Sequence, residues 1–215
     1  MPLAEETPPT GLWTGMVEAV DRLLEQVQAW GPVDILVNNA GIQHTAPLAE
    51  MPRETWEAIL AINLSAACHT MQALMPKMAQ RGFGRVSNIA SVHGLVASKD
   101  KAPYVAAKFG LVGLSRVAAL EYARVGSRES GGVTVNCIAP GWTETAIIEP
   151  QIVARAAAHG GDRAAGIAEL LSEKQPSQRT SDPSEIGALA LWLCAGVAHN
   201  ITGTTIPVDG GWTTQ

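Results

Sequence analysis

The chain has 215 residues, 47% hydrophobic and 16% charged, a composition ordinary for one globular domain. Its formal charge of −5 argues against nucleic acid as a partner. It contains no run of about 18 apolar residues that would span a membrane. Its acidic, proline-rich start (MPLAEETPPTG) lacks the basic and apolar regions of a signal peptide, so we expect a cytoplasmic protein.

The hydrophobic pattern predicts helices that alternate with short apolar strands. Residues 1–13 are expected to be a disordered loop, and a helix over 15–30 ends at Gly31-Pro32. The nearly continuous apolar run at 33–37 is typical of a parallel strand covered on both faces. Further strands are expected at 84–90, 133–139 and 204–208, and helices at 53–81, 102–124, 150–158, 163–173 and 183–195, with Pro76 kinking or ending the first of these.

This alternation of strands and helices predicts one α/β domain over residues 1–215, with a doubly wound, Rossmann-like parallel sheet. The three cysteines, Cys68, Cys137 and Cys194, are widely spaced and lie in apolar segments, so we expect them to be reduced and buried. No cluster of cysteine and histidine has metal-ligand spacing, and no metal site is expected.

Four features indicate chemistry rather than packing alone. Tyr104 and Lys108 are four residues apart at the start of a predicted helix, so their side chains share one face. Ser91 follows the end of a predicted strand, where open α/β sheets bind ligands. Asn63 is a lone amide in an apolar helical run, and the small residues of Asn38-Asn39-Ala40-Gly41 let a cofactor approach the backbone.

Together these residues resemble the motifs of the short-chain dehydrogenase/reductase family, from about residue 15 to the end of the chain. The resemblance implies that Tyr104 transfers the hydroxyl proton, with its pKa lowered by Lys108, while Ser91 binds the substrate oxygen and Asn63 holds a water that relays protons. It also implies a nicotinamide cofactor, NAD or NADP. The residues matching the family's cofactor site are Asn39, Ala40, Gly41, Tyr104, Lys108, Pro140, Gly141 and Thr145.

A narrower resemblance concerns the substrate. The strings NNAGIQH, ASVHG, KAPYVAAK and DGGWTTQ are similar to those of the family's branch that interconverts D-3-hydroxybutyrate and acetoacetate with NAD. This resemblance implies that Gln43, His93, Lys101 and Gln151 bind the substrate carboxylate, and that Trp142 and Trp212 form an apolar wall around its methyl group. Taken singly, each of these residues also has an ordinary reading as a surface or packing residue.

The sequence departs from the family at its start. Members begin with a strand, a glycine-rich turn (TGxxxGxG) and a helix that binds the pyrophosphate, and no such motif occurs in these 215 residues. We therefore expect that the family's first three strands are absent, that the sequence is a truncated gene product or an incomplete gene model, and that the chain binds dinucleotide weakly. The residue that would choose between NAD and NADP is absent with them.

Two other functions stay open at this point. The chain could be a catalytically silent remnant that acts only in assembly, since the resemblance implies a homotetramer formed through the late helices and the C-terminal strand. It could also be a reductase for another 3-oxo acid or for an acyl thioester. A free carboxylate needs Lys101 and Gln151, whereas a thioester carries no charge for them to bind.

Overall fold

The computed structural model describes residues 11–214, with side chains from residue 18 onward. In this part of the chain four strands form one parallel sheet in the order β1-β2-β3-β4. The strands are β1 (Ile35–Asn38), β2 (Phe83–Ile89), β3 (Gly132–Pro140) and β4 (Thr205–Val208). The expected parallel α/β fold is therefore confirmed, with each predicted strand within two residues of its expected position.

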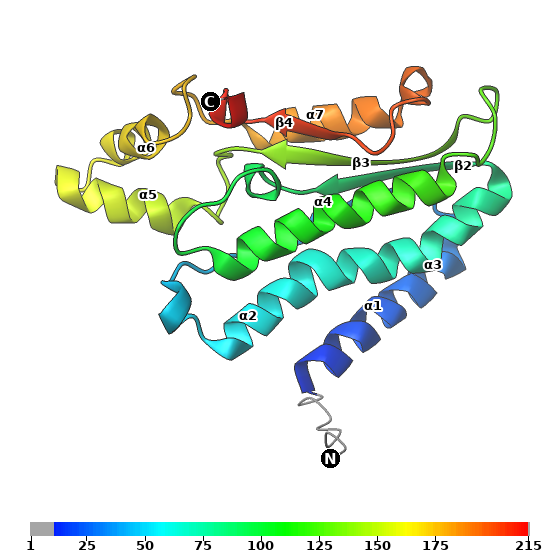
Figure 1. The fold of residues 1–215 in the computed structure, drawn as a ribbon, viewed down its shortest axis with the longest axis horizontal. Helices are drawn as coiled ribbons and strands as arrows, with labels where there is room; N and C mark the ends of the chain where they lie inside the picture. Colours follow the sequence, from blue (N-terminus) through cyan, green and yellow to red (C-terminus); the bar gives the residue numbers. More distant parts are fainter. Residues whose placement is uncertain (1–10, 215) are drawn as a thin grey trace, which may run out of the picture.

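Helices cover both faces of the sheet (Figure 1). One face carries α1 (Gly11–Trp30), α2 (Arg53–Leu60), α3 (Ala66–Arg81) and α4 (Ala102–Tyr122), and the other carries α7 (Pro183–Cys194). Two shorter helices, α5 (Glu149–Ala156) and α6 (Arg163–Ser172), lie beside the carboxyl ends of the strands, on the left of Figure 1. The edge at which open α/β sheets bind ligands is thus the one that α5 and α6 adjoin.

Two predicted elements differ in detail. Residues 11–13, expected in an N-terminal loop, instead form the first turn of α1, while residues 1–10 lie outside the described residues. The expected helix at 53–81 is interrupted by a π-helical turn at Ala61–Ser65, whereas α3 continues through Pro76 to Arg81. The irregular turn therefore lies at the candidate site residue Asn63, where π turns often serve function, and Pro76 does not end the helix.

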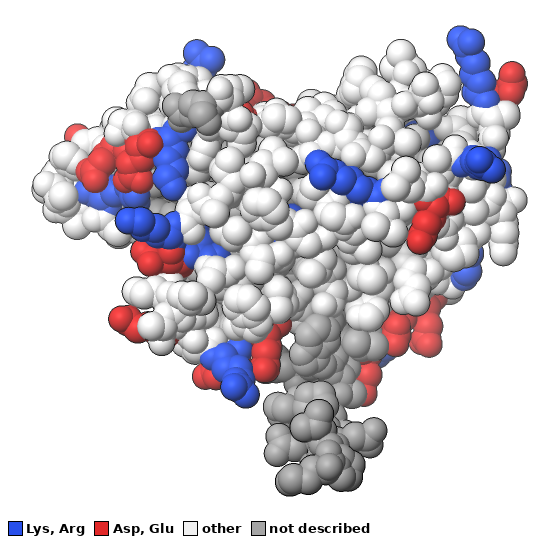
Figure 2. Space-filling view, viewed as in Figure 1, with Lys and Arg blue, Asp and Glu red and all other residues white. Residues whose placement is uncertain are grey.

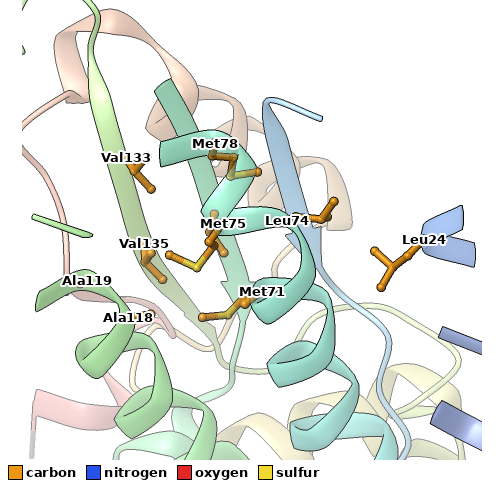
Figure 3. Close-up of a cluster of buried hydrophobic side chains, with 10 residues drawn as sticks. Leu24, Met71, Leu74, Met75, Met78, Ala118, Ala119, Val133 and Val135 are labelled. Carbon is orange, nitrogen blue, oxygen red and sulfur yellow. The ribbon is translucent and has the colours of Figure 1, made fainter. Parts of the chain in front are cut away.

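The main core lies between α3 and the sheet. Figure 3 shows Met71, Met75 and Met78 pointing from α3 toward Val135 and its neighbours on β3. The approach is close at Gly84, because a Cβ there would lie 2.6 Å from Sδ of Met78. Glycine at this position lets α3 sit directly on β2.

The combined helix Arg53–Arg81 is long and apolar enough, by length and composition alone, to cross a membrane. In this fold it is a packed core helix, since Ala67, Met71, Leu74, Met75 and Met78 are all buried against the sheet and α4. Its hydropathy is explained by this packing.

Among the described residues, strand β1 is an edge strand that pairs only with β2. Leu36 packs toward the main core, but Ile35 and Val37 point to the other face and are 48% and 46% exposed. A parallel strand normally has both faces covered, so this apolar face of β1 is open in the described part of the chain.

A chain of hydrogen bonds ties β1 to the neighbouring elements. Asn38 donates to Asn88 Oδ1 on β2 at 2.8 Å, and Asn88 donates to Ser115 Oγ on α4 at 2.8 Å. Thr70 of α3 donates to Asn38 Oδ1 at 2.8 Å. These bonds hold the ends of β1 and β2, from which the site residues extend, in a common register.

Candidate active site

The carboxyl ends of β1, β2 and β3 open into one cavity of about 570 Å³. Residues that follow each strand turn into it, as the family resemblance and the rule for open α/β sheets both imply. Of the residues predicted for the site, those lining the cavity are Asn39, Gly41, Gln43, Ser91, His93, Lys101, Tyr104, Lys108, Pro140, Gly141, Trp142, Thr145 and Trp212.

Three predicted residues do not line the cavity. Gln151 lies just behind it, where its Oε1 accepts a hydrogen bond from Lys101 Nζ at 3.2 Å. Ala40 is exposed between Asn39 and Gly41. Asn63 is buried behind the loop that follows β1.

The side chain of Asn63 bonds to that loop through one donor and one acceptor. Its Oδ1 accepts from the Ile42 backbone N–H at 2.9 Å, and its Nδ2 donates to the Ile42 carbonyl at 2.9 Å. The π-helical turn presents this amide to the loop, so in this structure Asn63 fixes the backbone beside Gly41. The expected role in holding a proton-relay water stays a prediction.

We expect Asn63→Ala to lower the free energy of unfolding by about 1–3 kcal/mol, because both Ile42 backbone groups lose their partner. Urea unfolding followed by circular dichroism measures this. Asn200→Ala is the control, since Asn200 is exposed, and its unfolding free energy should be unchanged. Equal effects of the two substitutions would contradict the assigned contacts.

Ser91, Tyr104 and Lys108 form a buried group at the floor of the cavity. Tyr104 hydrogen-bonds with Ser91, and Lys108 Nζ lies 5.6 Å from the centre of the Tyr104 ring. Lys108 Nζ donates to the Ile89 carbonyl at the end of β2 at 2.7 Å. Burial lowers the pKa of Lys108 to about 8, and the ammonium therefore remains mostly charged at neutral pH.

The pKa of Tyr104 differs from the expected direction. Burial raises it above its usual value, and the hydrogen bond with Ser91 acts in the opposite sense but is the smaller effect. The expected net lowering of the Tyr104 pKa is therefore wrong for this structure, because burial outweighs the effects that favour the phenolate. The phenol stays protonated at neutral pH, which suits it to donate a proton to a developing alkoxide.

The far end of the cavity combines positive charge with aromatic rings. Lys101 is buried, and its Nζ lies 5.0 Å from the centre of the Trp142 ring. The ring of Trp212 lies 5.5 Å from that of Trp142 and 5.4 Å from that of His93. Among the described residues that line the cavity, Lys101 and Lys108 are the only charged ones, and none is Asp or Glu. The cavity is therefore suited to a small anion with an apolar part.

Burial is also the main influence on the pKa values of His93 and Lys101, the other two titratable groups described at the cavity. It lowers the pKa of His93 to about 3, assisted by Lys101 and Lys174, so the imidazole is neutral at physiological pH. The pKa of Lys101 is lowered to about 8 by burial and by Lys174 and Arg155, with Glu173 opposing. Lys101 therefore loses its charge as the pH rises through about 8.

We expect binding of acetoacetate to weaken as the pH rises above about 8, approaching a tenfold loss per pH unit, because a neutral Lys101 no longer attracts a carboxylate. Quenching of tryptophan fluorescence measures this, since Trp142 lies beside Lys101. Lys108 faces the same cavity and titrates in the same range. Lys101→Met separates the two, because the variant should bind weakly with little dependence on pH.

Sequence reasoning missed three contributors to this site. Gln175, buried after α6, accepts a hydrogen bond at Oε1 from the Trp142 backbone N–H at 3.1 Å. Lys174 donates to Ser98 Oγ at 2.7 Å and lies 5.5 Å from the centre of the Trp212 ring. Helix α7 also lines the cavity through Pro183, Ile186, Gly187 and Ala190. No local pattern marks these residues, since only the fold brings them to the strand ends.

Part of the cavity has residues suited to a nicotinamide cofactor. Asn39, Gly41, Pro140 and Thr145 surround the cavity beside Lys108, which suits the nicotinamide and its ribose. At Gly41 a Cβ would lie 3.6 Å from Asn63 Oδ1 and 3.8 Å from Lys108 Nζ, so the backbone is closely approached there. The described residues include no group of three or more His, Cys, Asp or Glu side chains that could hold a metal ion.

These 215 residues contain no glycine-rich turn that would bind the pyrophosphate of such a cofactor. We therefore expect the 215-residue chain to bind NAD weakly, because only the nicotinamide half of the cofactor has residues that match the family's binding site. Titration with NAD, followed by calorimetry, measures this. Tight binding would show that other residues hold the pyrophosphate.

Comparison with known proteins agrees with this geometry. The family described as "Enoyl-(Acyl carrier protein) reductase" matches residues 16–213. The D-beta-hydroxybutyrate dehydrogenase of Cupriavidus necator is 47% identical over 197 residues, 91% of this chain and 74% of that protein. The D-beta-hydroxybutyrate dehydrogenase of Rhizobium meliloti is 42% identical over 198 residues, which are 92% of this chain and 74% of that protein. The structure of gluconate 5-dehydrogenase from Burkholderia cenocepacia, in complex with NADP and tartrate, superimposes with a TM-score of 0.77 at 31% identity, over 94% of this chain and 72% of that one.

The chain thus spans about three quarters of the length of these relatives. This share and the four-stranded sheet agree with the expected lack of the family's first three strands in the sequence given. The family match covers nearly the whole chain, and the sequence motifs that suggested it surround one cavity. The chain belongs to the short-chain dehydrogenase/reductase family of NAD(P)-dependent oxidoreductases.

Proposed function

We propose that the protein interconverts D-3-hydroxybutyrate and acetoacetate with NAD as the hydride acceptor and donor. The observation that carries this proposal is the far end of the cavity, where Lys101 and a pair of tryptophan rings lie together and no acidic residue intervenes. The curated relatives from two bacteria with this named activity are 47% and 42% identical to the chain. NAD rather than NADP is taken from the resemblance to that branch of the family.

In the proposed reaction Ser91 and Tyr104 bind the substrate oxygen. A nicotinamide held by the residues beside Lys108 would supply the hydride acceptor or donor for the carbon that bears this oxygen. During reduction, the buried and protonated Tyr104 gives its proton to the developing alkoxide, and Ser91 stabilises the charge by hydrogen bonding. During oxidation, Tyr104 takes the hydroxyl proton, and the charge of Lys108 beside its ring stabilises the phenolate that this requires.

The substrate is oriented by its two ends. Lys101 lies where it can pair with the carboxylate, with Gln151 holding the ammonium and neutral His93 nearby. Gln43 lines the same cavity and supplies a further amide. Trp142 and Trp212 form the apolar wall against which the methyl group packs. The tartrate in the related gluconate 5-dehydrogenase structure is likewise a small hydroxy acid.

The test is NADH formation from D-3-hydroxybutyrate by the purified 215-residue chain. It is read beside a chain extended at its N terminus with the part of the C. necator relative that the match does not cover. Activity only in the extended chain supports the substrate and shows that the added part completes the cofactor site. Activity in the 215-residue chain also supports the substrate assignment, but it shows that the added N-terminal part is not required for cofactor binding. Silence in both, with cofactor binding demonstrated in the extended chain, contradicts this substrate assignment and leaves either a different substrate or the silent remnant.

A reductase for an acyl thioester is the second candidate, favoured by the description of the matching family as an enoyl-(acyl carrier protein) reductase. A thioester has no charge for Lys101 to bind, so a buried ammonium beside the aromatic wall would serve no purpose there. Turnover of acetoacetyl thioesters in preference to acetoacetate would establish this candidate.

We also propose that the protein is a cytoplasmic homo-oligomer, a tetramer by resemblance. Helix α4 exposes Phe109, Val117 and Leu120, which are 45%, 53% and 79% accessible. Figure 2 shows mostly uncharged side chains on the face that α4 occupies, interrupted by basic and acidic groups, with mixed charges over α5 and α6 and at the opposite end. Large exposed apolar side chains on one helix favour contact with another chain.

The three cysteines are free, as is usual in a reducing compartment.

A further inference from the structure

Trp142 and Trp212, the apolar wall of the cavity, follow the ends of β3 and β4, where strand pairing no longer fixes the backbone. Their rings are 5.5 Å apart, and both side chains are buried. A wall built from residues beyond the strand ends needs other contacts to hold it at a defined distance from the reacting atoms.

The backbone of Trp142 is held by the connection between α6 and α7. Gln175 is 2% exposed, and its Oε1 accepts from the Trp142 N–H at 3.1 Å while its Nε2 donates to the Arg179 carbonyl. The Trp142 carbonyl accepts from the Ser181 N–H at 2.9 Å. Both polar backbone groups of Trp142 are therefore bound by this one connection.

The amide of Gln175 occupies space that only glycine at position 141 leaves free. A Cβ on Gly141 would lie 2.7 Å from Gln175 Oε1 and 2.9 Å from the Cα of Asp209. The connection is also joined to the end of β4, since the Ser177 N–H donates to the Gly210 carbonyl at 2.9 Å. The two tryptophan-bearing segments and the α6–α7 connection thus meet at one point, which Figure 1 shows as the C-terminal turn lying near the chain that follows α6.

Asp209 holds the second tryptophan. Its carboxylate is 7% exposed and accepts from the Gly211 N–H at 3.0 Å, the Thr213 N–H at 2.8 Å and Thr213 Oγ1 at 2.6 Å. These bonds close a turn around Trp212. Neither Gln175 nor Asp209 lines the cavity, so neither contacts the substrate.

We propose that Gln175 and Asp209 are positioning residues that set the distance of the tryptophan wall, and through it the length of hydroxy acid that the cavity accepts. This inference rests on the proposed function, since it assigns a specificity to the same site. Gln175 is easier to test than Asp209. One hydrogen bond of its side chain holds the Trp142 backbone, and the other, to the Arg179 carbonyl, orients the side chain itself.

Gln175→Met removes both hydrogen bonds with little change in volume. We expect the KM for D-3-hydroxybutyrate to rise about tenfold with kcat nearly unchanged, because the loss of a buried hydrogen bond misplaces the wall and not the proton-transfer groups. The preference for this four-carbon acid over D-3-hydroxypentanoate should fall about tenfold. Gln175→Glu keeps an oxygen that accepts from Trp142 and, protonated at this buried position, an O–H that donates to the Arg179 carbonyl. It should therefore recover most of the preference. Gln26→Met, the same change at an exposed glutamine of α1 outside the α6–α7 connection, should leave both values unaltered.

A readout that needs no turnover is fluorine NMR of the chain labelled with fluorotryptophan, with each resonance assigned by a Trp→Phe substitution. In Gln175→Met the Trp142 resonance should shift, while that of exposed Trp192 stays, and Gln175→Glu should restore it. An unmoved Trp142 resonance in a folded Gln175→Met chain would overturn the proposal. If the unaltered extended chain turns over neither acid, the proposed function fails, and the NMR result alone decides the role of Gln175.

Discussion

Replacing Tyr104 by Phe is expected to reduce kcat/KM for D-3-hydroxybutyrate by about 100- to 10,000-fold in the extended chain, while the unfolding midpoint stays nearly unchanged. In the proposed mechanism this hydroxyl, in contact with Ser91, exchanges a proton with the substrate oxygen. The phenylalanine keeps the buried ring and its packing against His93, so the loss is chemical and not structural.

The matched control is Tyr122→Phe, at the only other tyrosine of the chain, which lies at the end of α4 and packs beside the main core. Its activity should be that of the unaltered protein. The assay is initial-rate NADH formation, with thermal unfolding followed by circular dichroism. A Tyr104→Phe chain within about threefold of the unaltered rate would exclude Tyr104 as the acid–base group.

Replacing Lys101 by Met should raise the KM for D-3-hydroxybutyrate by about 10- to 100-fold and change kcat much less. A charged hydrogen bond to a buried carboxylate contributes about 1.5–3 kcal/mol, and the substitution removes the charge while keeping an apolar stem. The effect falls on binding because Lys101 lies at the aromatic end of the cavity, away from Lys108 and Ile89.

Lys99→Met is the control, because Lys99 is exposed on the same loop and carries the same charge. Steady-state kinetics at saturating NAD measure both variants. A Lys101→Met chain with an unchanged KM for hydroxybutyrate would exclude the carboxylate contact. An equal loss for an uncharged acetoacetyl thioester would show that the substitution disturbs the pocket and not the charge pairing.

The sequence by itself determined the elements and the chemistry that follows each strand. The runs at 84–90 and 133–139 become strands buried on both faces, although they include the buried polar residues Arg85, Asn88 and Asn136. The apolar run at 33–37 becomes β1, whose one apolar face stays open in the described part of the chain. Parallel strands end at one edge, so Ser91, Tyr104 and Gly141 could be expected near one another without any coordinates. The spacing of Tyr104 and Lys108 on one helix face needed only helical geometry.

The tertiary structure alone decided the properties that depend on burial and on distant contacts. The raised pKa of Tyr104 reflects its surroundings, which no spacing of residues discloses. Asn63 bonds to Ile42, 21 residues earlier, and Gln175 to Trp142, 33 residues earlier, because the π-helical turn and the α6–α7 connection pack onto the strand ends. The sequence determined which groups the site contains, and only packing determined which of them bind each other and which remain to face a substrate.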